Sequence, residues 1–199
     1  MPHKHTKYLT ELEMGGILFC FLVSILMKQL YALTDGHLIG VLFGAVNNSV
    51  WEQTKTLLLP YLLWGLLELL SVQPSMKRLT AAKTLSLYLL GGLLCGGGLL
   101  LRPCGAAANT AFSLAAVTFC SLFSLWLYRS PLYLKILFAP CVLLLFLFVS
   151  LYFSFMPFPP QLALFRDDET GMFGIIPIYM DKGAVILDAL AERISQKSC

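Results

Sequence analysis

Five long apolar stretches constrain this chain more than any other feature of its sequence. A helix needs about 20 mostly apolar residues to cross the hydrocarbon core of a bilayer. Five such stretches follow one another, and they run approximately over Met14–Leu33, Thr56–Val72, Thr80–Leu101, Ala106–Tyr128 and Leu132–Phe155. Because 13% of the 199 residues are charged, against about 25% in soluble domains, the chain cannot cover a water-facing surface. We therefore predict an all-α integral membrane bundle of five transmembrane helices.

The basic residues between these stretches predict how the bundle is oriented. Lysine and arginine collect in the cytoplasmic loops of membrane proteins. One side carries only Lys55 and Arg102 before the tail, whereas the other carries seven basic residues: Lys4, Lys7, Lys77, Arg78, Lys83, Arg129 and Lys135. We expect a multi-pass protein of the inner (plasma) membrane with its N-terminus in the cytoplasm and its C-terminus outside.

This orientation divides the chain into three parts. We expect residues 1–13 to form a cytoplasmic tail and residues 14–156 to form the five-helix transmembrane domain. Residues 157–199 should form an extracytoplasmic segment that contains a short amphipathic helix at about 181–195. The net charge of +3 is too small to predict a nucleic-acid partner. The bilayer itself is the partner that the sequence predicts.

Two ionisable residues lie inside the apolar stretches, where a charge near mid-bilayer costs about 2.5–3.5 kcal/mol. Lys28 lies near the outer end of the first stretch, where it either extends to the headgroups or belongs to a functional site. Glu68 lies near the inner end of the second stretch. We expect it to pair with Lys77 or Arg78, or to be exposed at the membrane interface.

Small residues predict which helices pack closely. Gly92 and Gly96 form a GxxxG pair in the third stretch, and the fourth stretch offers Ala111, Ser113 and Ala115. Because small residues let the backbones of membrane helices approach each other, we expect these two helices to touch.

Residues 46–55 form a strongly polar segment that enters the second stretch. On a helix with about 100° per residue, the side chains of Asn48, Glu52 and Lys55 share one face. Trp51 and Asn47 lie beside this face. The acid and the lysine are spaced to form an ion pair.

The same segment also has the features of an ordinary helix start. Ser49 or Asn48 can cap the helix, and Glu52 is favoured near the positive end of the helix dipole. A functional and a purely structural interpretation therefore both stay open.

Two separated motifs carry a resemblance. Residues 43–55 read F-G-A-V-N-N-S-V-W-E-Q-T-K, and residues 159–175 read P-P-Q-L-A-L-F-R-D-D-E-T-G-M-F-G-I. They resemble V-N-E-S-V-W-E-H-x-K and P-P-h-x-P-L-F-x-D-P-x-T-G-x-Y-G-I, the motifs of a family of uncharacterised small bacterial multi-pass membrane proteins. In that family the first motif precedes a helix with an early proline, here Pro60. The resemblance covers roughly residues 14–176 and implies no substrate or cofactor.

The departures from this resemblance concern the titratable positions. Asn48 stands where the family has glutamate, and Gln53 stands where it has histidine. Asparagine and glutamine form hydrogen bonds but do not titrate, so Glu52 is left as the base of this segment. In the tail motif, Ala163 and Asp168 replace prolines, and a phenylalanine at 173 replaces a tyrosine.

The predicted orientation places three polar segments on the outer face. These are residues 48–55, the turn at 102–104 and the tail at 165–174. We expect the tail to fold back over the outer end of the bundle, because its apolar side chains favour burial. Asp167 or Asp168 would then approach Lys55 or Arg102.

The function that these features favour is binding or transport, through a polar cluster that engages a small ligand, a lipid headgroup or a protein. The candidate residues are Asn47, Asn48, Trp51, Glu52, Lys55, Lys28, His37, Arg102 and Asp167. Two alternatives stay open: an intramembrane enzyme that uses Glu52 with His37 or Asp167, and a structural motif that locks the helices and the tail together. No motif predicts a metal, a cofactor or a catalytic set. Of the six cysteines, Cys104 and Cys199 are the two that could form a disulfide outside.

Overall fold

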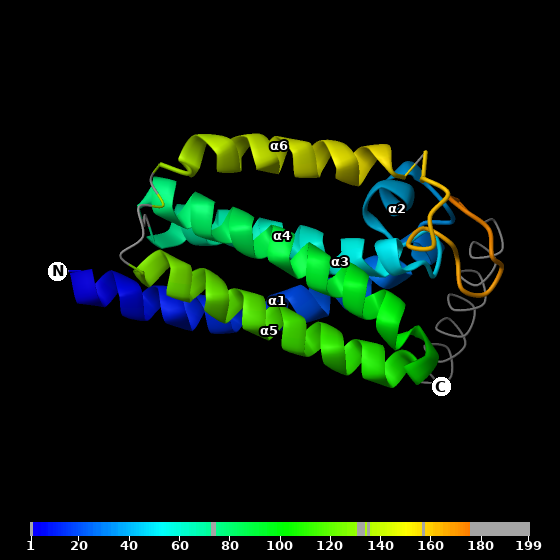
Figure 1. The fold of residues 1–199 in the computed structure, drawn as a ribbon, viewed down its shortest axis with the longest axis horizontal. Helices are drawn as coiled ribbons and strands as arrows, with labels where there is room; N and C mark the ends of the chain where they lie inside the picture. The colour runs from blue at the N-terminus through cyan, green and yellow to red at the C-terminus, as the bar shows by residue number, and fades with distance from the viewer. Residues whose placement is uncertain (1, 73–74, 131–133, 135, 157, 176–199) are drawn as a thin grey trace, which may run out of the picture. The chain divides into compact units, whose positions relative to one another are not determined.

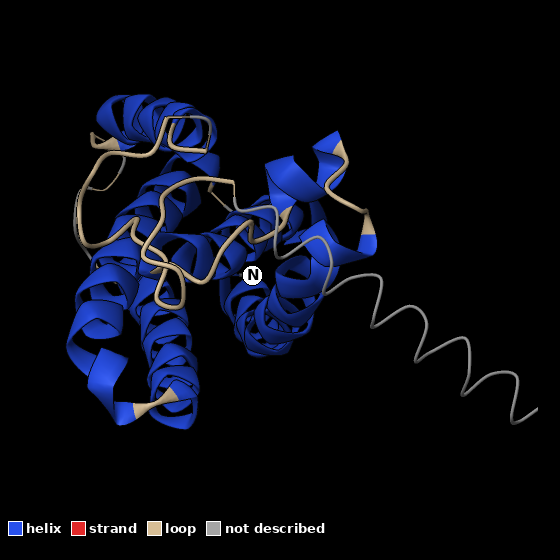
Figure 2. Cartoon of the chain, turned by 90° about the vertical axis from the view of Figure 1, so that its right-hand side faces the viewer, coloured by secondary structure: helices blue, strands red, loops and turns tan. Residues whose placement is uncertain are grey.

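A computed structural model describes residues 2–72, 75–130, 134, 136–156 and 158–175. In this part of the chain the regular elements are helices joined by loops (Figures 1 and 2). In order, they are α1 (Pro2–Leu33), α2 (Leu38–Phe43), α3 (Val50–Val72), α4 (Met76–Leu101), the 3-10 helix η1 (Arg102–Cys104), α5 (Ala106–Arg129) and α6 (Phe138–Ser154). The predicted all-α class is confirmed. The helix expected at 181–195 and Cys199 lie outside the described residues, and Cys104 is a free, exposed cysteine.

Each of the five predicted apolar stretches corresponds to one long helix. The starts of four helices differ from those of the stretches. The helix α1 begins at Pro2 rather than at Met14, and α3 begins at Val50 rather than at Thr56. The helix α4 begins at Met76 rather than at Thr80, and α6 begins at Phe138 rather than at Leu132. Pro140 lies in the first turn of α6, where the missing amide proton breaks no helical hydrogen bond. Three helical segments of the described chain are long and apolar enough to cross a membrane: Tyr8–Leu33, Met76–Cys104 and Ala106–Arg129.

The chain divides into two compact units. Among the described residues, unit 1 comprises those within 2–23 and 57–151, and unit 2 comprises those within 24–56 and 152–175. Helices α1, α3 and α6 therefore contribute residues to both units.

Unit 1 is built around the hairpin of α4 and α5, which lie side by side (Figure 1). Gly105, with a φ of +87°, makes the turn between η1 and α5, because a left-handed backbone is strained for residues with a Cβ. A Cβ added at Gly97 would overlap the Phe112 ring, whereas one at Gly92 or Gly96 would meet no described atom within 4 Å. The expected contact between these two helices is confirmed, but Gly97 makes it rather than the GxxxG pair.

One end of unit 1 is held together by hydrogen bonds between connections far apart in sequence. Arg129 at the end of α5 donates to the Thr10 hydroxyl of α1 at 2.6 Å. The amide of Ser75, just before α4, donates to the Tyr128 hydroxyl at 3.3 Å. The start of α1, the connection before α4 and the end of α5 therefore lie at the same end of this unit.

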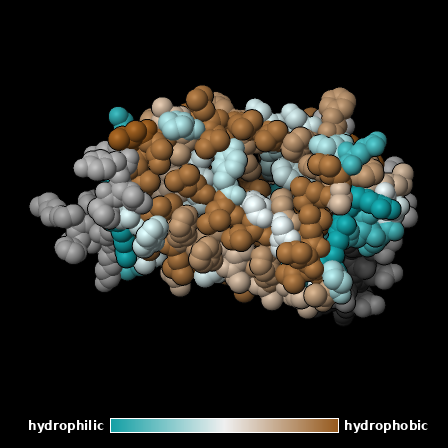
Figure 3. All heavy atoms as spheres, viewed as in Figure 1, coloured by the Kyte–Doolittle hydropathy of each residue, from teal (hydrophilic) through white to brown (hydrophobic). Residues whose placement is uncertain are grey.

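Large apolar side chains are exposed on the helices of unit 1. Leu100 is 79% exposed and Phe146 is 69% exposed, and Leu66 and Trp126 are more than half exposed. Apolar residues also cover most of the face seen in Figure 3. Patches of this extent are rare on soluble monomers, so the surface fits a lipid environment.

In unit 2, the chain turns back on the end of α1 and then enters α3. Asp35 and Gly36 end α1 with positive φ angles, and the amide of Ala45 donates to the Met27 carbonyl at 3.2 Å. A Cβ added at Gly44 would lie 2.7 Å from the Tyr31 amide nitrogen. The absence of a side chain at Gly44 therefore allows the segment after α2 to pack directly on the backbone of α1.

Candidate functional site

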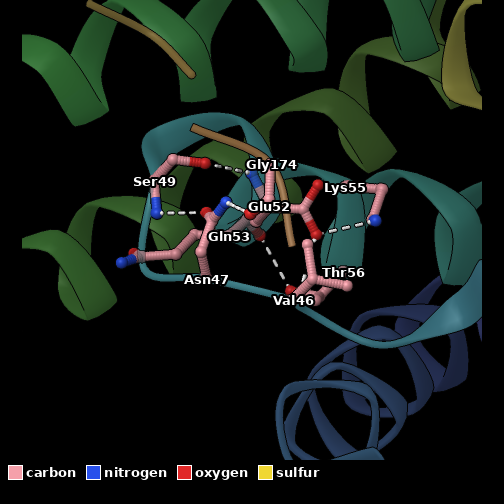
Figure 4. A network of polar contacts seen from close by, with 8 residues as sticks. All are labelled: Val46, Asn47, Ser49, Glu52, Gln53, Lys55, Thr56 and Gly174. Carbon is pink, nitrogen blue, oxygen red and sulfur yellow. Dashed lines mark hydrogen bonds and ion pairs between the residues drawn. The ribbon is translucent and has the colours of Figure 1, made fainter. Parts of the chain in front are cut away.

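Residues 46–55 form the start of α3 and the turn before it, within unit 2 (Figure 4). Ser49 caps the helix, because its Oγ accepts a hydrogen bond from the Glu52 amide at 3.3 Å. The Ser49 amide in turn donates to Oδ1 of Asn47 at 2.9 Å. A serine cap satisfies an amide that the first helical turn leaves without a backbone partner. Of the two predicted caps, Ser49 is the one that forms.

Glu52 and Lys55 form the predicted ion pair, with 2.7 Å between Oε2 and Nζ. The pair is buried, since the lysine side chain is 0% exposed and the glutamate side chain is 4% exposed. Oε2 also accepts a hydrogen bond from the Val46 amide at 3.1 Å, and the Lys55 ammonium lies 5.6 Å from the centre of the Tyr152 ring. These contacts hold the Glu52 carboxylate as an acceptor within the fold.

The tail lies against the start of α3, and backbone and side-chain groups hold it there. The Asn47 side-chain amide donates to the Gly174 carbonyl at 2.8 Å, and the Trp51 backbone amide donates to the Leu164 carbonyl at 3.0 Å. The Trp51 and Phe165 rings pack with their centres 5.3 Å apart. The predicted meeting of residues 46–55 with the tail is therefore observed.

Asp167 forms the most extensive of these tail contacts. Its Oδ1 accepts a hydrogen bond from the Asn48 amide at 2.8 Å, and its Oδ2 accepts from both the amide and the hydroxyl of Thr170 at 2.7 Å. The Asn48 side chain donates to Oε1 of Glu169 at 3.0 Å. Asp167 thus binds Asn48 and Thr170, and Lys55 pairs with Glu52. We call residues 46–55 together with 164–174 the tail lock.

Three other residues predicted for the site are not among those that build the tail lock. Lys28 is exposed on α1. His37 is exposed just before α2 and makes no side-chain cap to that helix. Arg102 belongs to unit 1, at the start of η1.

The chemistry of the tail lock favours a structural contact. Three of its acids bind other groups of the same network. Glu52 binds Lys55 and the Val46 amide, while Asp167 and Glu169 both bind Asn48. Trp51 differs, because its Nε1 is buried and has no acceptor among the described residues. Nor do the described residues include a group of three or more His, Cys, Asp or Glu placed to hold a metal ion.

A second buried charge cluster lies in unit 1 and joins three helices. Nζ of Lys83 in α4 lies 2.7 Å from Oε1 of Glu13 in α1 and 2.7 Å from Oε2 of Glu68 in α3. The side chains of Glu13 and Glu68 are 3% and 0% exposed, and that of Lys83 is 11% exposed. We call these three residues the buried triad. The expectation that Glu68 pairs with Lys77 or Arg78, or is exposed at the interface, is therefore wrong.

Aromatic side chains of α3 enclose the buried triad. The Tyr61 ring lies with its centre 5.2 Å from the Lys83 ammonium, and its hydroxyl donates to the Cys120 carbonyl of α5 at 3.2 Å. Nε1 of Trp64 donates to the Leu12 carbonyl of α1 at 3.1 Å. Four helices of unit 1 thus surround the charges, and a cation facing an aromatic ring is itself favourable.

An apolar cavity of about 390 Å³ opens between α3, α4 and α6 in unit 1. Leu66, Leu87, Leu145 and Phe146 are among the side chains that line it, and Lys83 is the charged residue among the described lining residues. A Cβ added at Gly65 would lie 3.4 Å from Cγ and Cδ of Lys83. The aliphatic part of the lysine therefore crosses Gly65 beside the cavity, while its ammonium binds the two glutamates.

Sequence reasoning missed Glu13 and Lys83 as site residues. It assigned Glu13 to a polar tail and Lys83 to the cytoplasmic loop charges. The depth of Lys83 was an available signal, because it lies about two turns inside α4, which begins at Met76. A second signal was the spacing of Gly65 and Glu68, which share one face of α3 and leave space there for a long side chain from another helix.

Comparison with known proteins gives a family match but no function. Residues 1–89 match the model of a family of unknown function (DUF6512). The matched part contains residues 46–55 and all three residues of the buried triad. No curated protein and no solved structure matches the chain. The expected resemblance to an uncharacterised family is confirmed for residues 1–89, and the tail motif at 159–175 lies outside the matched part.

Proposed function

We propose that the protein is a membrane-embedded lipid-binding protein, and that an acyl chain of the lipid occupies the cavity between α3, α4 and α6. The observation that carries this proposal is an apolar cavity on helices whose outer surface is also apolar. Its volume of about 390 Å³ lies in the range of about 300–1,000 Å³ that is usual for ligand pockets. In a bilayer, acyl chains are the apolar molecules available to fill it.

The position of the Lys83 ammonium supports an apolar ligand over an anionic one. The two carboxylates at 2.7 Å and the Tyr61 ring already surround the ammonium. The lysine therefore offers the cavity mainly its aliphatic part. A charged group placed among the leucine side chains would lose its hydration without a free counter-charge, whereas an acyl chain has no hydration to lose.

The position of the cavity along the helices supports binding of a lipid from one leaflet of the bilayer. Its lining residues fall within 61–69, 79–87 and 142–149, which is the half of α3 and α4 nearest the connection between them. With the N-terminus in the cytoplasm, this half lies in the cytoplasmic leaflet. Lys77 and Arg129 are exposed at that end of unit 1, and basic residues there favour an anionic headgroup.

We extend the proposal to the membrane topology: all five long helices cross an inner (plasma) membrane, with the N-terminus inside and the C-terminus outside. Support comes from the hydrogen bonds that bring Thr10, Ser75 and the α5 terminus to one end of unit 1. In an alternating bundle these three points belong to the same side. The basic residues predicted to be cytoplasmic flank them.

The outer polar cluster then has a different role from the binding site. A ligand at Asn47, Asn48, Trp51, Glu52 and Lys55 stays a prediction, but their contacts with each other and with Asp167 favour the structural alternative. The enzyme alternative loses support for the same reason, because Lys55 and the Val46 amide engage the Glu52 carboxylate. We propose that the tail lock fixes the chain after α6 to the start of α3.

Two neighbouring residues of α6 allow a matched test of lipid binding. Val142 lines the cavity, whereas Leu143 is 69% exposed. The probe is phosphatidylglycerol with a diazirine in its acyl chain, reconstituted with the full chain in nanodiscs and located by mass spectrometry after illumination. We expect labelling of cavity residues in the wild-type protein and in Leu143→Phe, and its loss in Val142→Phe, where the larger ring projects into the cavity and obstructs the acyl chain. Labelling that Val142→Phe leaves unchanged, or that spreads evenly to exposed residues such as Leu100, would contradict the proposal.

A further inference from the structure

We infer that the buried triad is a proton-binding site, in which Glu13 and Glu68 together hold one proton in addition to those of the Lys83 ammonium. The step is a simple protonation by a hydronium ion of the solvent. An O–H bond of hydronium breaks, an O–H bond forms on one carboxylate, and the products are a carboxylic acid and a water molecule. The inference does not depend on the lipid proposed for the cavity.

The charge count is the first argument. Two carboxylates and one ammonium give a net charge of −1 when all three groups are ionised. Among the described residues, the ion pairs of Glu13 and Glu68 are those with Lys83 alone. An uncompensated charge enclosed by protein is strongly unfavourable, and a buried acid relieves it by taking up a proton. One added proton makes the cluster neutral.

The unused oxygen atoms provide the place for this proton. Oε2 of Glu13 and Oε1 of Glu68, which are not the atoms paired with the ammonium, are buried and have no hydrogen-bond partner among the described residues. The buried Ser124 hydroxyl of α5 lies within hydrogen-bonding range of the Glu13 carboxyl group. A carboxylic acid can donate to such a hydroxyl, whereas a carboxylate can only accept.

The other groups that face the triad do not supply a positive charge. Tyr61 faces it from α3, Cys20 faces it from α1, and Cys120 lies behind Tyr61 in α5. Phenols and thiols are uncharged near neutral pH. The α6 residues on the far side of the cavity, including Val142 and Leu145, are apolar.

A proton fits the site better than a metal ion. The ammonium already lies 2.7 Å from both carboxylates, so a second cation that bound the same acids would be placed close to it. Two like charges at such a distance repel each other strongly where the surroundings are poorly polarisable. A proton neutralises the acid within a covalent bond and creates no second cation.

The inference predicts how many protons each variant holds. Replacing either glutamate by glutamine leaves one carboxylate and one ammonium, which are neutral as a pair. The extra proton should therefore be lost from Glu13→Gln and from Glu68→Gln alike. Glu11→Gln is the matched control, because Glu11 lies on the same helix as Glu13 but is exposed.

Infrared spectroscopy of the full chain in nanodiscs tests this directly. A protonated carboxylic acid gives a carbonyl band that is absent from carboxylates and that shifts in D₂O. At neutral pH we expect a band equivalent to one carboxylic acid per chain in the wild type and in Glu11→Gln, and its loss in Glu13→Gln and Glu68→Gln. The wild-type band should also disappear as the pH is raised.

The wild-type measurement alone can overturn the inference. A spectrum without a carboxylic acid band at neutral pH contradicts it, whether or not the variants fold. A band that persists in both Glu13→Gln and Glu68→Gln also contradicts it, because the proton would then belong to another group.

Discussion

At the scale of single residues, the two buried charge clusters differ in their balance of charge. Glu52 and Lys55 form a neutral pair, so the loss of one partner leaves the other charge buried and alone. The buried triad has one acid more than it has bases, so it remains close to neutral when it loses a glutamate. Replacing a glutamate by glutamine should therefore leave an unpaired buried charge at the Glu52–Lys55 pair, whereas at the buried triad it should leave the charges balanced.

The Glu52–Lys55 pair gives a prediction about stability. Glu52→Gln leaves the Lys55 ammonium without a counter-charge, and breaking a buried pair in this way costs about 3–5 kcal/mol. We expect poor accumulation in the membrane and a correspondingly lower free energy of unfolding in detergent. The double variant Glu52→Gln/Lys55→Met should be more stable than the single one, because it removes both charges. A single variant that folds as well as the wild type but has lost its biological function would instead support a catalytic role for Glu52.

Contacts between residues close together in the sequence could be predicted, whereas contacts between residues far apart in the sequence could not. Ser49 caps α3 by accepting a hydrogen bond from the Glu52 amide, and the Glu52 side chain pairs with Lys55. Each contact lies within a single helical turn, so the spacing of the residues alone indicates both. Glu68 reaches Lys83 on another helix. The helical faces that meet depend on the packing of the whole unit, which no local pattern encodes.

At the scale of elements, the hairpin of α4 and α5 shows the same limit. The sequence predicts that a glycine-rich helix packs on its neighbour, and this is correct. It does not predict which side of α4 faces α5. The three consecutive glycines at 96–98 lie on three different sides of the helix, and each side would allow close packing. The Phe112 ring lies against Gly97, while Gly92 and Gly96 face open space in the described chain.

Alanine substitutions on α4 test which of its sides faces α5. Gly97→Ala places a methyl group in the space of the Phe112 ring, and overpacking of this kind costs about 1–3 kcal/mol. Gly96→Ala adds the same methyl group where the described chain has no atom within 4 Å, so its stability should be at least that of the wild type. Thermal unfolding in detergent measures both. Equal destabilisation by the two variants, or a larger loss from Gly96→Ala, would contradict the observed packing of α4 on α5.

Asp167 gives a second prediction at this scale, for the tail lock. Asp167→Ala removes the acceptor of the Asn48 amide and of both Thr170 donors, and each such hydrogen bond contributes about 0.5–1.5 kcal/mol. We expect limited proteolysis to cut the tail at 158–175 faster. Gln161→Ala, at an exposed position of the same tail, should behave like the wild type. Identical cleavage rates for Asp167→Ala and the wild type would show that the tail is held by other contacts.

At the scale of the whole molecule, the membrane class follows from the sequence but the binding site does not. Apolar stretches of spanning length are a property of consecutive residues, and three of the helices keep that length and composition in the structure. The cavity is formed by side chains from α3, α4 and α6. Its existence depends on how far α6 stands from the other two helices, and this distance has no signature in the sequence.

The topology proposal makes a prediction for the two chain ends. Five crossings place the N-terminus in the cytoplasm and the C-terminus outside. Paired reporters, one active only in the cytoplasm and one only outside, should therefore give opposite signals at the two ends. Fusion after Arg129, at the end of α5, should report the cytoplasm. Both termini in one compartment would contradict the odd number of crossings.

The central claim is that a lipid chain lies in the cavity of unit 1, and a high-resolution structure of the protein in anionic-lipid nanodiscs tests it most directly. We predict a continuous, elongated density beside Leu66, Leu145 and Phe146, and the absence of this density in Val142→Phe. A map that resolves lipids elsewhere on the protein but shows this cavity empty, or filled by side chains of α6, would contradict the claim.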